Sequence, residues 1–543
     1  MARSACSCTA EIGPTKPPTK PQRCVAQEMP TGGPIRLIGI TKSSFCNKRD
    51  ILKIEFGSLL KKTKPQLSDK VYNYLANLFG KESAEKYLDF MEEYPSVYVR
   101  VNDLKIERDE LVKRLNKRYN IEPEIFDALP NTLKFHEREE DLGKTLEIVL
   151  GYYYIQGFSS MLPPYVLNPA ENDKVLDLCS APGSKTTQMA ELMNNKGTLI
   201  VNEVQLDRIK ALIYNLDRLN IINTGVIHSK GELLTKYYLN YFDKILVDAP
   251  CSGLGIMQKK IEVNQWWSLD RVNKLHDLQV RLLVAAIKML KSGGEVVYST
   301  CTLTPEENEL VIEKLLRKYP VEVMDIDLPV KYRNGFTSYD GKQLHPDLEK
   351  AIRILPWEAD SDGFFMIKLR KTEETDPLEK ERWKKSYTSE FLKPGNKKIS
   401  KYLSYISETF GIDEEIFLQY NYILKRKDIF FINKNWVDVN LGLFHRIGTK
   451  FGTIDKRDDI VLHTNAAQIL DKHITKNIYN VKDKDELRLY LAGGLIPNDN
   501  IDRGQYVIKY NDYVLGTAVV TSGGIKSRFP RSKRTQTIRL GEF

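Results

Sequence analysis

The sequence predicts an α/β protein built on a doubly wound, mostly parallel β-sheet. Two observations support this fold. From Gly151 to about Lys371, short apolar segments alternate with segments whose apolar residues recur every three or four positions. Two of the apolar segments also end abruptly in polar loops that carry Cys251 and Cys301. Alternation of this kind is typical of βαβ units, and ligands bind at the carboxyl ends of such parallel strands.

The individual elements follow from the same periodicities. Strands are predicted where β-branched and apolar residues run together, at 174–178, 198–202, 223–228, 242–247, 295–299 and 363–369. Helices are predicted between them, at 185–193, 207–219, 277–290 and 306–318. The last strand follows a long excursion of the chain, so we expect it to pair antiparallel to its neighbour.

The rest of the 543-residue chain is long enough for further domains. We expect a disordered basic tail at 1–49, for which a targeting presequence is a second interpretation. An N-terminal α+β module that binds RNA is expected at 50–150, because helical spacing at 71–79 and 84–91 precedes an alternating strand at 96–102. The α/β domain occupies 151–371 and a charged linker 372–400. A C-terminal β-rich region follows at 401–543, with a hairpin turn expected at Asn511 and Asp512.

Composition excludes several classes of protein. No apolar run approaches the length of a membrane span, so we expect no membrane association. Seven cysteines form an odd set in a large chain, which argues against a disulfide scaffold and for a reduced, cytoplasmic setting. A three-cysteine metal site is disfavoured because no Cys-x-x-Cys pair or nearby histidine completes it, and no metal is expected. We expect a monomer.

The net charge of +9 is concentrated at the two ends of the chain. Near the C-terminus, cations surround a phenylalanine in a segment opened by two glycines, an arrangement that suits an RNA backbone and a stacked base. These cations are Lys526, Arg528, Arg531, Lys533 and Arg534. A solvated tail is the alternative interpretation.

Two further places are candidates for contact with RNA. Arg100 and Asn102 lie on the alternating strand of the N-terminal module, where they either face a ligand or belong to an exposed edge strand. After Cys251, the residues Lys259 and Lys260 precede Trp266 and Trp267. Cations that follow phosphates and aromatic rings that stack on bases are typical of single-stranded RNA binding. We expect one of the two tryptophans to be buried and the other exposed.

The segment from Val175 to Thr186 combines a strand, a Pro-Gly turn and the start of a helix. Gly183 lets the backbone approach a ligand closely, but the spacing matches neither a Walker loop nor a dinucleotide fingerprint. Glu203 ends the next strand, where a carboxylate would accept hydrogen bonds from the hydroxyls of a ribose. A nucleoside without a pyrophosphate remains, and the sequence therefore predicts S-adenosylmethionine as the cofactor.

Two cysteines at neighbouring strand ends suit methylation of a pyrimidine. C5 of cytosine is a poor nucleophile, and addition of a thiolate to C6 turns the ring into an enamine that attacks a methyl donor. An acid such as Asp248 assists by protonating N3 or hydrogen bonding to it, and a second thiol helps when C5 loses its proton. Spacing alone leaves open which cysteine attacks. Lys185 either adjusts the acidity of a nearby group or only solvates a helix end.

Three ordered motifs carry a resemblance to a known family: Asp177–Lys185, Asp248–Cys251 and Ser299–Cys301. They resemble the signatures of the Nop/Sun family of RNA cytosine-C5 methyltransferases. The match also takes in Tyr154–Leu162, Thr304–Asn308 and Asp362–Phe365. The resemblance implies a Rossmann-like class I methyltransferase domain that acts on rRNA or tRNA. It implies that the residues after 400 form a PUA-like extension, as in the bacterial branch that modifies small-subunit ribosomal RNA.

The resemblance also implies roles for individual residues. It assigns the nucleophile to Cys301 and product release to Cys251, with Asp248 and Lys185 beside them. The residues it implies for cofactor binding are Cys179, Ser180, Ala181, Pro182, Gly183, Ser184, Lys185, Glu203, Arg208, Ser229 and Asp248. One position departs from the family, which places an aspartate after the third strand where this chain has His228 and Ser229. Ser229 or a backbone group is expected to replace it.

Two other functions are open at this point. A methyltransferase acting on proteins or small molecules would share the cofactor loop, but it would not need two cysteines at strand ends. A non-catalytic RNA-binding scaffold with a degenerate cofactor site would account for the departure at Ser229.

Overall fold

The computed structural model describes residues 67–543 apart from 137–138, 377–389, 499, 535–536 and 542–543. The tail predicted at 1–49 and the beginning of the N-terminal module lie outside the described residues. All described residues belong to one unit, which extends to Phe543.

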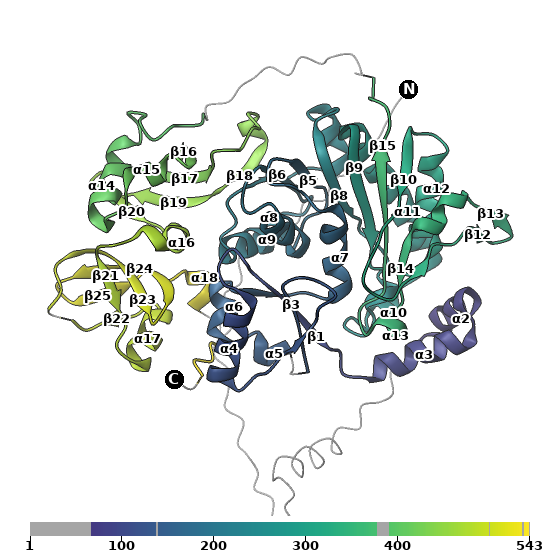
Figure 1. Ribbon diagram of the computed structural model, residues 1–543, viewed down its shortest axis with the longest axis horizontal. Coiled ribbons are helices and arrows are strands. Elements are labelled where there is room, and N and C mark those ends of the chain that lie inside the picture. The colour runs from purple at the N-terminus through teal and green to yellow at the C-terminus, as the bar shows by residue number, and fades with distance from the viewer. Residues whose placement is uncertain (1–66, 137–138, 377–389, 499, 535–536, 542–543) are drawn as a thin grey trace, which may run out of the picture. The chain divides into compact units, whose positions relative to one another are not determined.

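A mixed sheet with a parallel centre forms the middle of this unit (Figure 1). Its strand order is β11-β14-β15-β9-β8-β5-β6-β7-β18, with β10 also paired to β15. The five strands from β9 to β7 in this order run parallel, and β15 is antiparallel to β9, as predicted for the strand after the excursion. Their bounds are β5 Lys174–Asp177, β6 Thr198–Asn202, β7 Thr224–Ile227, β8 Phe242–Asp248, β9 Leu290–Thr300 and β15 Phe364–Lys371.

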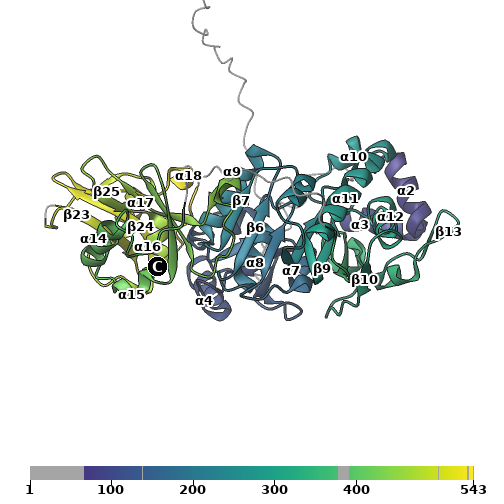
Figure 2. The ribbon, with the colours of Figure 1, turned by 90° about the horizontal axis from the view of Figure 1, so that it is seen from above.

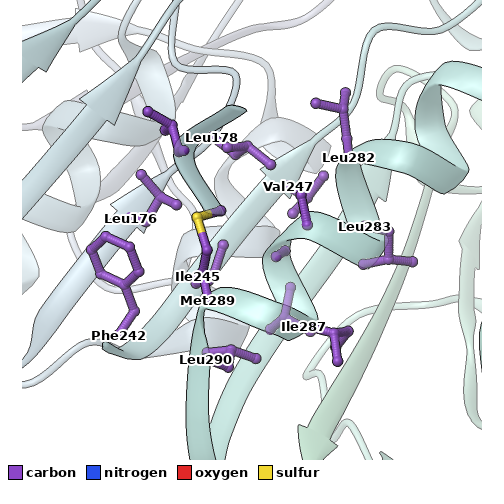
Figure 3. Packing of buried hydrophobic residues seen from close by; sticks show 14 of the residues in the cluster. Leu176, Leu178, Phe242, Ile245, Val247, Leu282, Leu283, Ile287, Met289 and Leu290 are labelled. Carbon is purple, nitrogen blue, oxygen red and sulfur yellow. The ribbon is translucent and has the colours of Figure 1, made fainter. Parts of the chain in front are cut away.

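Helices cover both faces of this sheet because successive strand residues point to opposite sides. Val175, Leu199 and Leu246 pack with α8 (Ser184–Leu192) and α9 (Leu206–Arg218). Their chain neighbours Leu176, Ile200, Ile245 and Val247 pack on the other face with α11 (Leu269–Met289) and α12 (Glu309–Leu316), as Figure 3 shows for α11. The predicted doubly wound α/β fold is confirmed.

Two helices on this second face differ from their predicted bounds. Helix α11 begins eight residues before the predicted start, because Ser268 caps it by accepting a hydrogen bond from the backbone N–H of Arg271. The helix predicted from residue 306 instead opens as the 3₁₀ turn η3 (Pro305–Glu307), and α12 follows after Asn308.

The described part of the N-terminal module contains a helix pair and a small antiparallel sheet. Helices α2 (Asp69–Phe79) and α3 (Lys81–Glu92) pack against the loop after β8 through Tyr87 and Trp267. The sheet has the order β2-β3-β1-β4. The module's other elements are β1 Val97–Val101, α4 Arg108–Tyr119, β2 Glu124–Ile125, β3 Thr132–Phe135, α5 Glu139–Leu142 and α6 Leu146–Leu150; β4 Tyr153–Ile155 and α7 Phe158–Leu167 follow.

The described residues of the C-terminal region form two sheets of their own, with strand orders β16-β17-β19-β20 and β21-β23-β24-β25-β22. The predicted turn at Asn511 and Asp512 is confirmed, since it joins β23 to β24 with Asn511 in the left-handed region. Its strands are β16 Tyr420–Lys425, β17 Asp428–Asn433, β18 Phe444–Ile447, β19 Thr449–Ile454, β20 Ile460–Leu462, β21 Ile478–Asn480, β22 Leu495–Ile496, β23 Gly504–Tyr510, β24 Tyr513–Thr521 and β25 Gly524–Ser527. Its helices are α14 Ser400–Phe410, α15 Glu414–Phe417, α16 Thr464–Ile469, α17 Lys484–Leu491 and α18 Arg531–Arg534.

One strand of the C-terminal region completes the central sheet. Strand β18 pairs antiparallel with β7. The C-terminal region therefore lies on the β7 side of the central sheet (Figure 2). Trp436 and Phe444 pack over Gly225 of β7, where a Cβ atom would approach the Phe444 ring to 2.6 Å. Arg446 is paired with Asp217 of α9, with Nη1 2.9 Å from Oδ2. The sequence did not predict this strand, which is only four residues long.

The excursion between α12 and β15 adds three short strands at the opposite end of the central sheet: β10 Val321–Met324, β11 Arg333–Asn334 and β14 Ile352–Ile354. Strands β12 Ser338–Tyr339 and β13 Lys342–Gln343 form a separate two-stranded sheet. The short helices α10 (Val263–Trp266) and α13 (Pro356–Ala359) complete this part. Among the described residues, no helix has the length and apolar character needed to cross a membrane.

Candidate active site

The structure brings the two strand-end cysteines together. Strands β8 and β9 are parallel neighbours, with Asp248 opposite Ser299. The loops that follow place the Sγ atoms of Cys251 and Cys301 3.2 Å apart. Both cysteines are free and partly exposed, so a ligand at the carboxyl end of the sheet can reach them.

An ion pair lies beside the cysteines. Nζ of Lys185, from the first turn of α8, lies 2.8 Å from Oδ2 of Asp248 and donates a second hydrogen bond to Ser160 Oγ at 2.9 Å. Ser299 Oγ donates to the other carboxylate oxygen of Asp248. Burial alone would lower the pKa of Lys185, but the Asp248 carboxylate outweighs it and raises that pKa. Lys185 therefore stays protonated next to the cysteines.

The two thiols are not equivalent. The hydrogen bond to Cys301 and then burial raise the pKa of Cys251 well above its ordinary value. Cys251 therefore keeps its proton, whereas either sulfur can be the donor of the contact between the two cysteines. The thiolate is the reactive form of cysteine, so this asymmetry favours Cys301 as the nucleophile.

The predicted cofactor loop lies between β5 and α8, next to this pair. Gly183 has φ +107°, and a Cβ atom there would lie 2.9 Å from Leu212 Cδ1, so only glycine fits this turn. No side chain caps the N-terminus of α8, which leaves backbone N–H groups of its first turn for a carboxylate such as that of methionine. In Asp177, Oδ2 accepts a hydrogen bond from the Thr186 hydroxyl, but the buried Oδ1 has no partner among the described residues. Burial raises the pKa of Asp177 to about 7.

Glu203 lies at the end of β6, as the ribose-binding interpretation requires. Its carboxylate accepts from the backbone N–H of Gln205 and is 3.2 Å from Nη1 of Arg208. Arg208 also donates to the carbonyl oxygen of Ala181, so it ties Glu203 to the cofactor loop. Ser229 donates to the carbonyl oxygen of Lys230, and His228 Nε2 contacts the carbonyl oxygen of Val204.

These residues fit S-adenosylmethionine. The open helix N-terminus suits its carboxylate, the acceptor capacity of Glu203 suits its ribose, and the glycine turn admits its chain. The other loop residues predicted for cofactor binding are Cys179, Ser180, Pro182 and Ser184. Among these, burial raises the pKa of Cys179 well above its ordinary range, so Cys179 is a neutral thiol.

The predicted RNA contacts of Arg100 and Asn102 are wrong. Arg100 is only 4% exposed and donates to Thr187 and Glu191 of α8, both also buried. Asn102 is fully buried and donates to the carbonyl oxygens of Gly151 and Leu219. All five residues of strand β1 and the following Asn102 are buried, so neither side chain reaches an RNA surface.

The loop after Cys251 presents cations and an aromatic ring. Lys259 and Lys260 are exposed, and Lys259 pairs with Asp362 at 2.8 Å. Trp266 is 39% exposed beneath the Arg271 guanidinium, whereas Trp267 is 5% exposed and packs on Tyr74. The expectation of one buried and one exposed tryptophan is confirmed.

The C-terminal cations divide into two groups. Lys526, Arg528 and Arg531 are exposed, as an RNA contact requires. Lys533 is buried and donates to the carbonyl oxygen of Val149, and burial lowers its pKa to about 7. Arg534 donates to the carbonyl oxygen of Phe529. The prediction for Lys533 is wrong, because its ammonium holds the C-terminal region to the N-terminal module.

The predicted base-stacking role of the phenylalanine in this segment is also wrong. Phe529 is 1% exposed and packs on the ring of Tyr490 inside the C-terminal core. An amphiphilic segment gives the same pattern of cations and one aromatic residue whether that ring faces solvent or the core.

Sequence reasoning missed several side chains at the site. Ser160 and Ser299 hold Lys185 and Asp248, and Glu307 and Asn308 lie buried behind the cysteines. All four lie within motifs that carry the resemblance, but their spacing to the cysteines gives no signal of contact.

Comparison with known proteins identifies the family. The family model for 16S rRNA methyltransferase RsmB/F matches residues 164–370, which contain both cysteines and the cofactor loop. A ribosomal RNA small subunit methyltransferase F from Shewanella sp. (strain MR-4) is 34% identical over 451 residues, covering 80% of this chain and 90% of its own length. The chain belongs to the RsmB/F (Nop/Sun) family. It is therefore a methyltransferase that uses S-adenosylmethionine.

Two archaeal relatives match this methyltransferase over a shorter length. A tRNA (cytosine(49)-C(5))-methyltransferase from Pyrococcus abyssi is 36% identical over 307 residues, covering 56% of this chain and 97% of the relative. A crystal structure of a methyltransferase homolog protein from Pyrococcus horikoshii has a TM-score of 0.50 and 33% identity, covering 56% of this chain and all of its own. Each of these two relatives aligns with little more than half of the present chain.

Proposed function

We propose that this chain methylates C5 of a cytosine in ribosomal or transfer RNA through a covalent bond between Cys301 and C6 of the base. The observation that carries the proposal is the contact between two sulfur atoms, at 3.2 Å, beside a Lys185–Asp248 ion pair. The names of two relatives support RNA as the substrate, and one of them specifies cytosine C5. Methyl transfer to an atom other than C5 of a pyrimidine would not need a second cysteine.

In the proposal, Cys301 attacks as a thiolate, the nucleophilic form of cysteine. Its sulfur adds to C6, and the electron pair displaced from the C5–C6 double bond is taken up as N3 gains a proton. In the proposal, Lys185 gives up this proton and the Asp248 carboxylate beside it relays the proton to N3. Ser160 and Ser299 hold this pair in a single geometry.

Bound S-adenosylmethionine supplies the electrophilic methyl group. After methylation, C5 carries both a methyl group and a proton. Water takes the proton from C5, the C5–C6 double bond re-forms and the Sγ–C6 bond breaks, with its electron pair returning to Cys301. The N3 proton then returns through Asp248 to Lys185. Cys251 is the side chain next to the Cys301 sulfur, so we assign it to this release step.

In the proposal, exposed groups on the loop after Cys251 and in the C-terminal region hold the RNA. In the proposal, Lys259, Lys260 and the exposed ring of Trp266 contact RNA near the target base. Lys526, Arg528 and Arg531 contact phosphates from the C-terminal region, which we propose to be PUA-like. The division at 151, 371 and 401 remains the proposed domain organisation, and a cytoplasmic monomer remains a prediction.

A trapping experiment tests the covalent step. Cys251→Ala protein, incubated with S-adenosylmethionine and RNA from cells lacking the gene, is expected to accumulate a denaturant-resistant protein–RNA adduct. Cys301→Ala and the double variant are expected to form neither adduct nor 5-methylcytosine. An adduct in Cys301→Ala instead would reverse the two roles, and an adduct in none of the variants would exclude the covalent route. Bisulfite sequencing of RNA with and without the gene would then locate the cytosine.

A further inference from the structure

The turn that follows Cys301 carries two buried polar side chains to which the reaction above gives no task. Glu307 and Asn308 close the 3₁₀ turn η3, and both side chains are completely buried behind the cysteines. Buried carboxylates are costly unless every oxygen is bonded, so their partners show what the turn holds.

Glu307 holds the loop of Cys251. Its Oε1 accepts from the backbone N–H of Ser252 at 2.8 Å, and its Oε2 accepts from the Ser252 hydroxyl. Gln279 Nε2 donates both to Glu307 Oε1 at 3.0 Å and to the carbonyl oxygen of Pro250 at 2.8 Å. The carboxylate thus fixes the residue after Cys251 directly and the residue before it through Gln279.

Asn308 holds the loop of Cys301 in the same way. Its Oδ1 accepts from the Thr300 hydroxyl at 2.6 Å, and its Nδ2 donates to the carbonyl oxygen of Thr302 at 3.1 Å. These two threonines flank Cys301. A 2.9 Å hydrogen bond between the hydroxyls of Ser252 and Thr302 joins the two loops directly.

We infer that Glu307 and Asn308 are positioning residues that clamp the two cysteine loops and so set the contact between the sulfur atoms. The catalytic consequence of this inference rests on the proposed function. The clamp itself can be tested through the reactivity of the two thiols, without RNA. Burial raises the pKa of Glu307, and the four hydrogen bonds that its carboxylate accepts oppose this shift by favouring the charged form. Its negative charge helps Cys251 to keep its proton.

The test compares Glu307→Gln with Glu309→Gln. Glu309 is equally buried two residues later, but it pairs with Arg353 and contacts neither cysteine loop, so it controls for loss of a buried carboxylate. Alkylation by iodoacetamide, followed at each cysteine by mass spectrometry from pH 6 to 11, reports the thiols without any RNA. We expect the midpoint for Cys251 to fall by about one pH unit in Glu307→Gln and to stay unchanged in Glu309→Gln.

Methylation assays give the second readout. In Glu307→Gln, kcat is expected to fall by at least about tenfold with little change in KM for RNA, because the sulfur geometry changes and RNA binding does not. Unchanged alkylation profiles, or equal changes in both variants, would overturn the clamp. If Glu307→Gln does not fold, Ser252→Ala and Thr304→Val each remove one bond to Glu307 and should shift the profile in the same direction. A wild-type protein that forms no 5-methylcytosine would refute the proposed function and leave the alkylation result to decide the clamp.

Discussion

Lys185 and Asp248 form a largely buried ion pair whose Nζ–Oδ2 distance is 2.8 Å, although 63 residues separate them in the chain. Lys185 comes from the helix of the cofactor loop, and Asp248 ends the central strand that leads to Cys251. The pair therefore joins the region that fits the methyl donor to the region that holds the thiols. Removing one partner leaves the other charge poorly compensated.

Lys185→Met is expected to lower the rate of methyl transfer by about a hundredfold, because the variant lacks both the proton source and the counter-charge for Asp248. Single-turnover assays would measure the rate, and the same loss should appear in adduct formation by Cys251→Ala. Ser160→Ala removes only one hydrogen bond to Lys185 and should cost less than about tenfold. A Lys185→Met enzyme with wild-type rates would exclude this proton pathway.

Asp177→Asn is expected to remove a pH-dependent loss of stability. Burial raises the pKa of Asp177 from 3.8 to about 7, so the folded protein holds this proton more tightly than the unfolded chain. The stabilisation is complete below the unfolded pKa and is lost as pH rises through about 7. Without cofactor, the free energy of unfolding of the wild type should fall relative to the variant by about 2.7 kcal/mol between pH 5 and pH 8. Urea titrations at both pH values measure this difference, and parallel pH profiles would contradict it.

Gly225→Ala is expected to loosen the C-terminal region from the central sheet. A Cβ atom there would lie 2.6 to 2.7 Å from atoms of Phe444 and Trp436, and overpacking of this kind costs about 1–3 kcal/mol. Gly395→Ala is the matched control, because a Cβ atom at Gly395 meets nothing within 4 Å. Thermal unfolding should show a lower Tm for the first variant alone. Equal Tm values would mean that Phe444 and Trp436 can shift to admit the added Cβ atom without loss of stability.

Replacing Lys526, Arg528 and Arg531 by alanine together is expected to weaken RNA binding and its dependence on salt. Loss of three phosphate contacts should reduce the slope of log affinity against log salt by about two. Fluorescence anisotropy at several salt concentrations measures both quantities. Lys533→Ala is the control: its ammonium is buried on the Val149 carbonyl oxygen, so it should lower Tm and leave the slope unchanged. An unchanged slope in the triple variant would remove this surface from the RNA site.

The sequence alone predicted the parts of this protein that depend on local pattern. Apolar runs located the parallel strands to within a few residues, and the polar residues that end two of them located Cys251, Cys301 and Asp248 at one edge of the sheet. The glycine turn at Gly183 was also readable, because only glycine suits its backbone conformation. These features follow from alternation and from the residue itself.

Tertiary structure decided which polar residues face solvent. Arg100 and Lys533 look like RNA contacts in the sequence, yet both are buried on partners tens or hundreds of residues away. The joining of β18 to β7 and the hold of Glu307 on the Cys251 loop also depend on distant segments that meet only in the folded chain. A cation or a carboxylate can have the same neighbours in the sequence whether it is exposed or buried. Long-range packing determines whether it meets water or a buried partner.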